Sequence, residues 1–152
     1  MRKYRELDPN FDEDKIKRAV SDLYFHMQET WQTKDISRLK SCMTDEFYAM
    51  MDKRLNYFRE DKQTDHTENI LVNDVALQGW RQSDERDFIL VELKSQIVSY
   101  VSDDTTGELI SGDKSKKISM EYEIEISRKS GTITGEKFDW SVSNMDGHRQ
   151  GA

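Results

Sequence analysis

The sequence predicts an α+β domain in which amino-terminal helices cover one face of an antiparallel sheet of about four strands. Apolar residues recur at three- and four-residue steps in the first half of the 152-residue chain, and they alternate with polar residues in the second half. Helices and strands in separate runs are typical of this class. Three Trp, six Tyr and six Phe are spread along the chain, which favours a folded core over disorder. One domain is predicted for residues 8–143, with residues 1–7 and 144–152 as flexible tails.

Three helices are predicted in the first half. The segment "DPNFDEDKIKRAVSDLYFHMQETWQT" offers Asp12 as an N-cap for a long helix. Its apolar stripe consists of Ile16, Val20, Leu23, Met27 and Trp31. A short helix is expected over residues 36–43, and Thr44 is the expected N-cap of a third helix over residues 45–61. The inward positions of that third helix are Phe47, Met51, Leu55 and Phe58.

Four strands are predicted in the second half. The clearest is "ISMEYEIEIS", in which apolar side chains alternate with polar ones and predict one buried and one solvated face. The segments "NILVNDVALQGW", "RDFILVELKSQIVSYV" and "EKFDWSVSN" supply the other three strands. The intervening "QSDER" and "RKSGTITG" are expected to be turns.

The segment "SDDTTGELISGD" has part of the spacing of a calcium-binding loop. Such a loop takes side-chain oxygens at its first, third and fifth positions and a bidentate glutamate at its twelfth, with helices on both sides. Those positions hold Ser102, Asp104, Thr106 and Asp113, so the first carboxylate is missing and the last side chain is one carbon short. Strand patterns flank the segment. We therefore predict a hairpin with Gly107 and Gly112 at positive φ, and no metal site.

Composition argues against several classes of function. The net charge of −7 disfavours a nucleic-acid binder, and the single cysteine, Cys42, excludes an intrachain disulfide and a cysteine-based zinc site. No pair of histidines has metal-ligand spacing. No apolar run has the length of a membrane span and no signal peptide opens the sequence, so the expected location is cytoplasmic, or membrane-peripheral through a flanking segment. No nucleotide-binding or hydrolase motif occurs, so neither an enzyme nor a cofactor is expected.

Two groups of residues are candidates for binding. A cavity between helices and sheet would be lined by aromatic and polar side chains, for which the candidates are Tyr24, His26, Trp80, Tyr100 and Tyr122. The alternative role for these residues is core packing. The second group consists of Glu121, Glu123 and Glu125, which alternate along one strand face. They form either a solvated face or an acidic surface that docks a basic partner.

Several short motifs in order resemble a known family. "DPNFDEDKI", a late Trp31 and "KDISRLKSCMTDEFY" precede a hairpin with Thr-Gly-Glu at 106–108, Gly-Asp at 112–113 and Glu-Tyr at 121–122. Together they resemble the domain of the mitochondrial inner-membrane translocase subunit 44, over residues 8–142. The resemblance implies a cone of the nuclear transport factor 2-like or cystatin-like type, with helices on a curved antiparallel sheet. It also implies a scaffold role at a membrane, without catalysis. Glu123 departs from the family, where tryptophan is common.

Three functions are therefore open. The first is a non-catalytic interaction or scaffold domain that binds a protein partner at a membrane surface, as a monomer or dimer. The second is a small-molecule pocket in the cone, with or without catalysis. The third is weak binding to anionic lipid through "MRKYR" and the first helix, at about 1 kcal/mol per basic residue.

Overall fold

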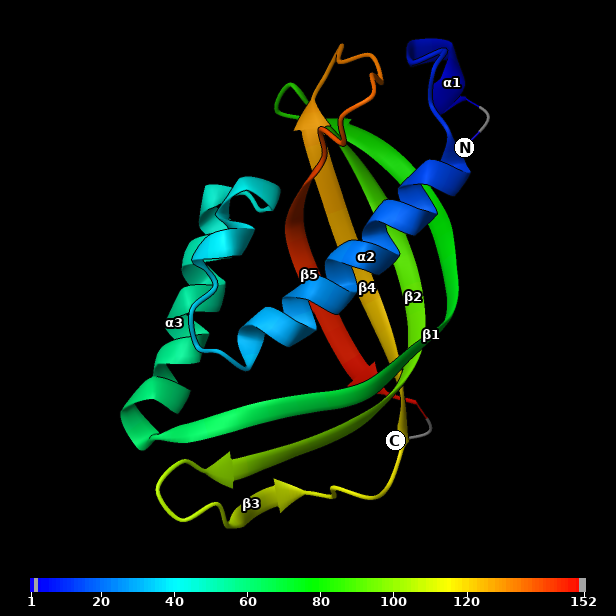
Figure 1. The fold of residues 1–152 in the computed structure, drawn as a ribbon. Coiled ribbons are helices and arrows are strands. Elements are labelled where there is room, and N and C mark those ends of the chain that lie inside the picture. Colours follow the sequence, from blue (N-terminus) through cyan, green and yellow to red (C-terminus); the bar gives the residue numbers. More distant parts are fainter. Residues whose placement is uncertain (2, 151–152) are drawn as a thin grey trace.

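The computed structural model describes residues 1 and 3–150, and Figure 1 shows their arrangement. The helices are α1 (Tyr4–Leu7), α2 (Glu13–Trp31), the 3-10 helix η1 (Ser37–Cys42) and α3 (Asp45–Asp61). The strands are β1 (Gln63–Ser83), β2 (Arg86–Asp103), β3 (Leu109–Gly112), β4 (Ile118–Lys129) and β5 (Ser141–Arg149). This is the predicted α+β class.

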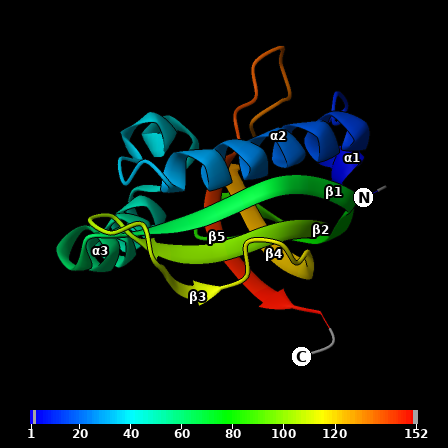
Figure 2. The ribbon, with the colours of Figure 1, turned by 60° about the horizontal axis from the view of Figure 1, so that its bottom comes forward.

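The strands form one antiparallel sheet in the order β1-β2-β4-β5, and β3 pairs with the far end of β2. Register shifts in β1, between Glu68 and Leu71, between Val72 and Asp74 and between Leu77 and Gly79, bend the β1–β2 pair. Helix α2 crosses one face of the resulting curved sheet, and α3 lies beside β5 (Figures 1 and 2). The other face of the sheet carries no helix among the described residues. The cone implied by the family resemblance is therefore confirmed.

The two long helices begin at the predicted caps. The Asp12 carboxylate accepts hydrogen bonds from the backbone amides of Asp14 and Lys15, and the Thr44 hydroxyl accepts one from the amide of Phe47. The expected short second helix is the 3-10 helix η1. Helix α3 ends at Lys62, whose φ of 52° lets the chain turn directly into β1.

The core lies between the helices and the inner face of the sheet, which is the face toward α2. The buried apolar residues of α2 are Ile16, Val20, Tyr24 and Met27, and those of α3 are Phe47 and Leu55. Every second residue of β2 and β4 faces them, and the most buried of these are Ile89, Val91, Leu93, Ile124 and Ile126. Leu23, Trp31, Met51 and Phe58 are only partly buried, because each helix presents a narrower stripe to the sheet than the sequence pattern suggested.

Residues 4–7 and 144–149 lie in α1 and β5, within the segments 1–7 and 144–152 for which the sequence suggested flexible tails, and residues 2, 151 and 152 of those segments lie outside the described residues. Tyr4 has no exposed surface, and its hydroxyl donates a hydrogen bond to Asp87 at 2.7 Å. Strand β5 pairs with β4 as far as Arg149. Tyr4 is a single aromatic residue among charged ones, and the end of β5 is polar. Neither segment has the apolar periodicity from which an ordered element could be predicted. Conversely, residues 136–140 of the expected last strand belong to the loop before Ser141.

The hairpin interpretation of residues 102–113 is confirmed. Strands β2 and β3 pair across it, and Gly107 and Gly112 have φ of 75° and 85°. The Asp103 carboxylate accepts hydrogen bonds from the amides of Thr105 and Thr106, which closes the turn. A Cβ atom at Gly112 would collide with the Ser99 carbonyl and with Tyr100 Cα. The loop residues therefore serve the turn itself.

Candidate functional site

An open cavity of about 250 Å³ lies between the carboxyl-terminal half of α2, helix α3 and the inner face of the sheet. Its apolar lining includes one methionine from each of four elements, namely Met27 of α2, Met51 of α3, Met120 of β4 and Met145 of β5. Methionine side chains are flexible and polarisable, so such a wall adapts to ligands of different shape. Its polar lining residues are Gln28, Asp65, Thr67 and Ser99.

Among the described residues that line the cavity, Asp65 has the only acidic or basic side chain. It stands at the start of β1, and its Oδ2 accepts a hydrogen bond from the indole Nε1 of Trp31 at 3.1 Å. Burial raises the pKa of the Asp65 carboxyl, although the Trp31 hydrogen bond and the nearby His66 partly oppose this shift. No ion pair of Asp65 occurs in the described part of the chain, and Lys34 pairs with Asp104 instead.

The structure brings together only part of the predicted pocket. Tyr24 and Tyr122 are neighbours, with ring centroids 4.9 Å apart, and Tyr122 lines the cavity. His26 lies outside it, with 67% of its side chain exposed on α2. Trp80 packs against Tyr4 at the other end of the domain, and Tyr100 stacks on His66 next to the β2–β3 hairpin.

The predicted glutamates lie on the outer face of the sheet, which is the face away from α2. Glu123 is directly opposite Glu92 of β2 on one side and Asp146 of β5 on the other. Glu125 pairs with Arg81 at 3.3 Å, and Glu121 lies 3.7 Å from His148. Glu92, Glu123 and Asp146 therefore form a row of three carboxylates across three strands, which we call the acidic row. The Cβ atoms of directly opposite residues are about 4.5–5.5 Å apart, so these charges repel. Lys94, whose Nζ lies 3.7 Å from Glu92 Oε1, offsets part of the charge at one end of the row, whereas Glu123 and Asp146 have no ion pair among the described residues.

A hollow of about 230 Å³ adjoins the acidic row on the outer face. Phe88 and Leu90 of β2 line it together with Gly79, and Leu90 is 38% exposed. The Arg81 guanidinium stacks on the Phe88 ring at 4.0 Å. Apolar and acidic surfaces thus adjoin on the same outer face.

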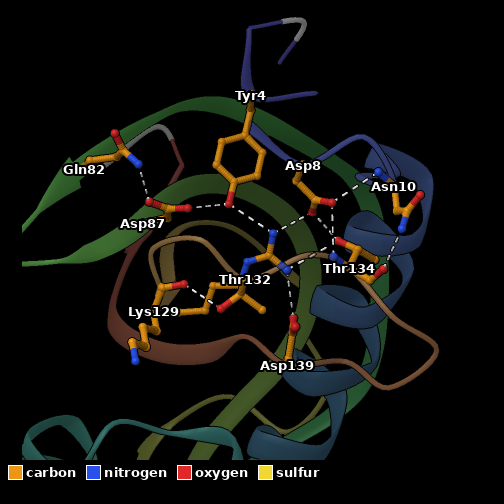
Figure 3. A network of polar contacts seen from close by, with 10 residues as sticks. Tyr4, Asp8, Asn10, Gln82, Asp87, Lys129, Thr132, Thr134 and Asp139 are labelled. Carbon is orange, nitrogen blue, oxygen red and sulfur yellow. Dashed lines mark hydrogen bonds and ion pairs between the residues drawn. The ribbon is translucent and has the colours of Figure 1, made fainter. Parts of the chain in front are cut away.

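A buried polar network fixes the chain start to the end of the sheet (Figure 3). Arg128, 2% exposed, pairs with Asp8 at 2.6 Å and with Asp139 at 3.0 Å. Its Nη2 also donates to the Tyr4 hydroxyl at 3.1 Å, and its guanidinium lies 4.3 Å from the Trp140 ring centroid. Burial raises the pKa of the Tyr4 hydroxyl, whose hydrogen bond to Asp87 acts in the same direction. Apart from Arg128 Nε, which is buried without a hydrogen-bond partner among the described residues, these groups are engaged with one another, so the network is structural.

A family model for the Tim44-like domain matches residues 1–147. The chain belongs to the Tim44-like domain family. A crystal structure of the intermembrane space region of the chloroplast protein ARC6 is similar in fold, with a TM-score of 0.52 and 8% sequence identity. The similarity covers 88% of this chain and 97% of that one. No curated protein sequence matches the chain.

Sequence reasoning identified Glu123 in this Tim44-like domain but missed Asp65 on the inner face and Glu92 and Asp146 on the outer face. Asp65 lies in the polar segment "QTDHTE", which has no strand periodicity, and β1 includes it because α3 ends at Lys62. Asp146 falls in the segment expected to be a tail, and Glu92 comes from a different strand. Only the pairing of strands places Glu92 and Asp146 beside Glu123.

The described residues contain no cluster of three histidine, cysteine or acidic side chains placed to hold a metal ion. None of the described helices has the length and apolar character needed to cross a membrane.

Proposed function

We propose that this Tim44-like domain is a non-catalytic interaction domain that binds a basic segment of a protein partner on the outer face of its sheet. The observation that carries the proposal is the acidic row of Glu92, Glu123 and Asp146. Like charges directly opposite one another cost stability. A cationic partner that lies across the row relieves this repulsion, so binding gains energy that the free domain lacks.

Two further features favour a partner that is amphipathic as well as basic. The hollow at Phe88 and Leu90 offers an apolar contact. It lies close to the acidic row, because Leu90 is opposite Glu125 and two residues from Glu92. Residues two apart on one strand face are about 6.8 Å apart, which is a suitable spacing for one basic and one apolar side chain of an extended peptide. Tim44-like domains are, as a family, associated with protein interaction at membranes.

The test compares partner binding by two variants of equal net charge. In Glu123→Gln/Asp146→Asn the middle and one end of the acidic row are neutralised. In the matched control, Asp22→Asn/Glu29→Gln, two exposed carboxylates of α2 are neutralised instead. The probe is a synthetic peptide of alternating lysine and leucine, and binding is followed by the backbone amide NMR signals of the ¹⁵N-labelled domain.

We expect the amide shifts to fall on β2, β4 and β5 and the row variant to bind about tenfold more weakly, while the control binds like the unaltered domain. Added salt should weaken binding, since these exposed charges are screened. Shifts confined to the helices, or equal binding by both variants, would refute the proposal. A vesicle of anionic phospholipid serves as a second probe, and binding to it through β2, β4 and β5 would also argue against an acidic docking face.

A further inference from the structure

The cavity on the inner face combines one half-buried carboxylate with a mostly apolar and aromatic wall. Asp65 lines it together with Trp31, and the described part of the chain provides its carboxylate with one hydrogen bond and no ion pair. Burying a carboxylate without a counter-charge is costly. The fold does not require a carboxylate at position 65, because the Trp31 indole N–H could equally well donate its hydrogen bond to a neutral oxygen.

The charged groups around Asp65 are accounted for elsewhere. His66 follows it in β1, but the imidazole Nε2 hydrogen-bonds to the Ser102 hydroxyl at 2.8 Å and the ring stacks on Tyr100. Lys34 pairs with Asp104, and Arg59 of α3 binds Asp52 and the Lys34 carbonyl. The Asp65 carboxylate is therefore free to bind a cation that enters the cavity.

The walls are suited to an organic cation rather than to a hydrated ion. Trp31 and Tyr122 present aromatic rings, which attract cations through their faces. The hydroxyls of Thr67 and Ser99 line the same cavity and can accept hydrogen bonds from an ammonium group. The four methionines, Met27, Met51, Met120 and Met145, surround the remaining space and would contact an apolar stem.

We propose that this cavity binds an alkylammonium group, with its nitrogen on the Asp65 carboxylate and its apolar stem among the methionines. The site excludes carboxylates and other anions, which Asp65 repels. The ammonium comes either from a small free amine or from a lysine side chain, and both share this chemistry. The site lies on the opposite face of the sheet from the acidic row, so the two proposals fail or succeed separately.

Three probes of equal length test the charge preference on the unaltered domain. They are n-hexylammonium, 1-hexanol and hexanoate, and the readout is the Trp31 indole N–H signal, assigned with Trp31→Phe. We expect a saturable shift with hexylammonium and at least about tenfold weaker binding of the other two. Equal or tighter binding of hexanol or hexanoate would overturn the proposal.

The methyl signals of the seven methionines locate the bound probe. Shifts should appear at Met27, Met51, Met120 and Met145 but not at Met43 or Met50, and the opposite distribution would show that the amine binds elsewhere. Nα-acetyl-lysine methylamide identifies the source: binding as tight as hexylammonium points to a lysine side chain, and weaker binding points to a free amine.

Two aspartate variants complete the test. Asp65→Asn keeps an oxygen that accepts from Trp31, so the fold is retained, and hexylammonium should bind about tenfold more weakly. Asp74→Asn removes an exposed carboxylate from the same strand and should change nothing. Unchanged affinity in Asp65→Asn would show that the carboxylate does not hold the ammonium.

Discussion

Two aspartates of this domain have opposite electrostatic environments although both are buried or half-buried. For Asp8, burial alone would raise the pKa, but hydrogen bonds from Thr134 and Arg128 outweigh it and lower the pKa below 3.8. For Asp65, burial dominates over the Trp31 hydrogen bond and raises the pKa above 3.8. The charged form of Asp8 therefore stabilises the fold, whereas the charged form of Asp65 destabilises it.

The sign of the Asp8 shift predicts a pH dependence. Because the folded pKa is lowered, its contribution is fully present above the unfolded pKa of about 4 and is lost as pH falls through the folded value. Asp8→Asn should reduce the free energy of unfolding at neutral pH by about 3–5 kcal/mol, because Arg128 then stays buried with half of its charge partners.

Chemical denaturation at neutral pH and across the acid range below pH about 4 measures both effects. The variant should show a flatter acid limb than the unaltered domain. The graded control is Asp139→Asn, which removes a partially exposed partner of the same guanidinium and should cost less. Equal losses in the two variants, or an unchanged acid limb in Asp8→Asn, would contradict this assignment.

At the scale of elements, the sequence predicted those helices and strands that depend on interactions between residues close in the chain. Helices α2 and α3 follow from their caps and apolar spacing, and β4 follows from the alternation of residues 118–126. The alternation fails at Ser127 and Arg128, both buried, because Arg86 covers the serine and Tyr4 and Asp8 reach the arginine from the chain start. These contacts join residues 41 to 124 positions apart, and no periodicity reports them.

The carboxyl-terminal part of β5 shows how strand pairing completes the cavity. Gly147 is directly opposite Tyr122, and the Tyr122 ring lies over the glycine so closely that a Cβ atom there would collide with it. An aromatic side chain that covers a glycine on the next strand shields the ladder from water. The wall of the cavity at Tyr122 therefore depends on a glycine in a segment that sequence reasoning took for a tail.

Gly147→Val is expected to displace the Tyr122 ring and to lower the free energy of unfolding by about 1–3 kcal/mol, the cost typical of overpacking. Thermal unfolding followed by circular dichroism measures the loss, and the Tyr122 ring signals report the displacement. Gly135→Val is the control, since a Cβ atom at Gly135 meets no neighbouring atom within 4 Å. If the two variants lose equal stability, the close contact with Tyr122 does not limit residue size at position 147.

At the scale of the whole molecule, the sheet separates two surfaces of different character. The inner face holds the cavity with Asp65, and the outer face holds the acidic row, while the network around Arg128 closes one end of the cone. Each surface retains a carboxylate that the fold alone does not need. Such residues are expected where stability is given up for binding.

Because the two surfaces are separate, we predict that the stability changes from neutralising a carboxylate on each of them add up. Asp65→Asn and Glu123→Gln should each raise the free energy of unfolding at neutral pH. The first removes a half-buried carboxylate, and the second ends cross-strand repulsion and should contribute about 0.2–1 kcal/mol. The double variant should equal the sum of the two within about 0.5 kcal/mol, because a strand layer separates residues that share no contact. Added salt should diminish the gain from the exposed Glu123→Gln more than the gain from Asp65→Asn.

Urea denaturation of the unaltered domain, the two single variants and the double variant, at low and at high salt, measures this cycle. A deviation well beyond that margin would mean that the two faces are coupled through the sheet, and that binding on one face alters the other.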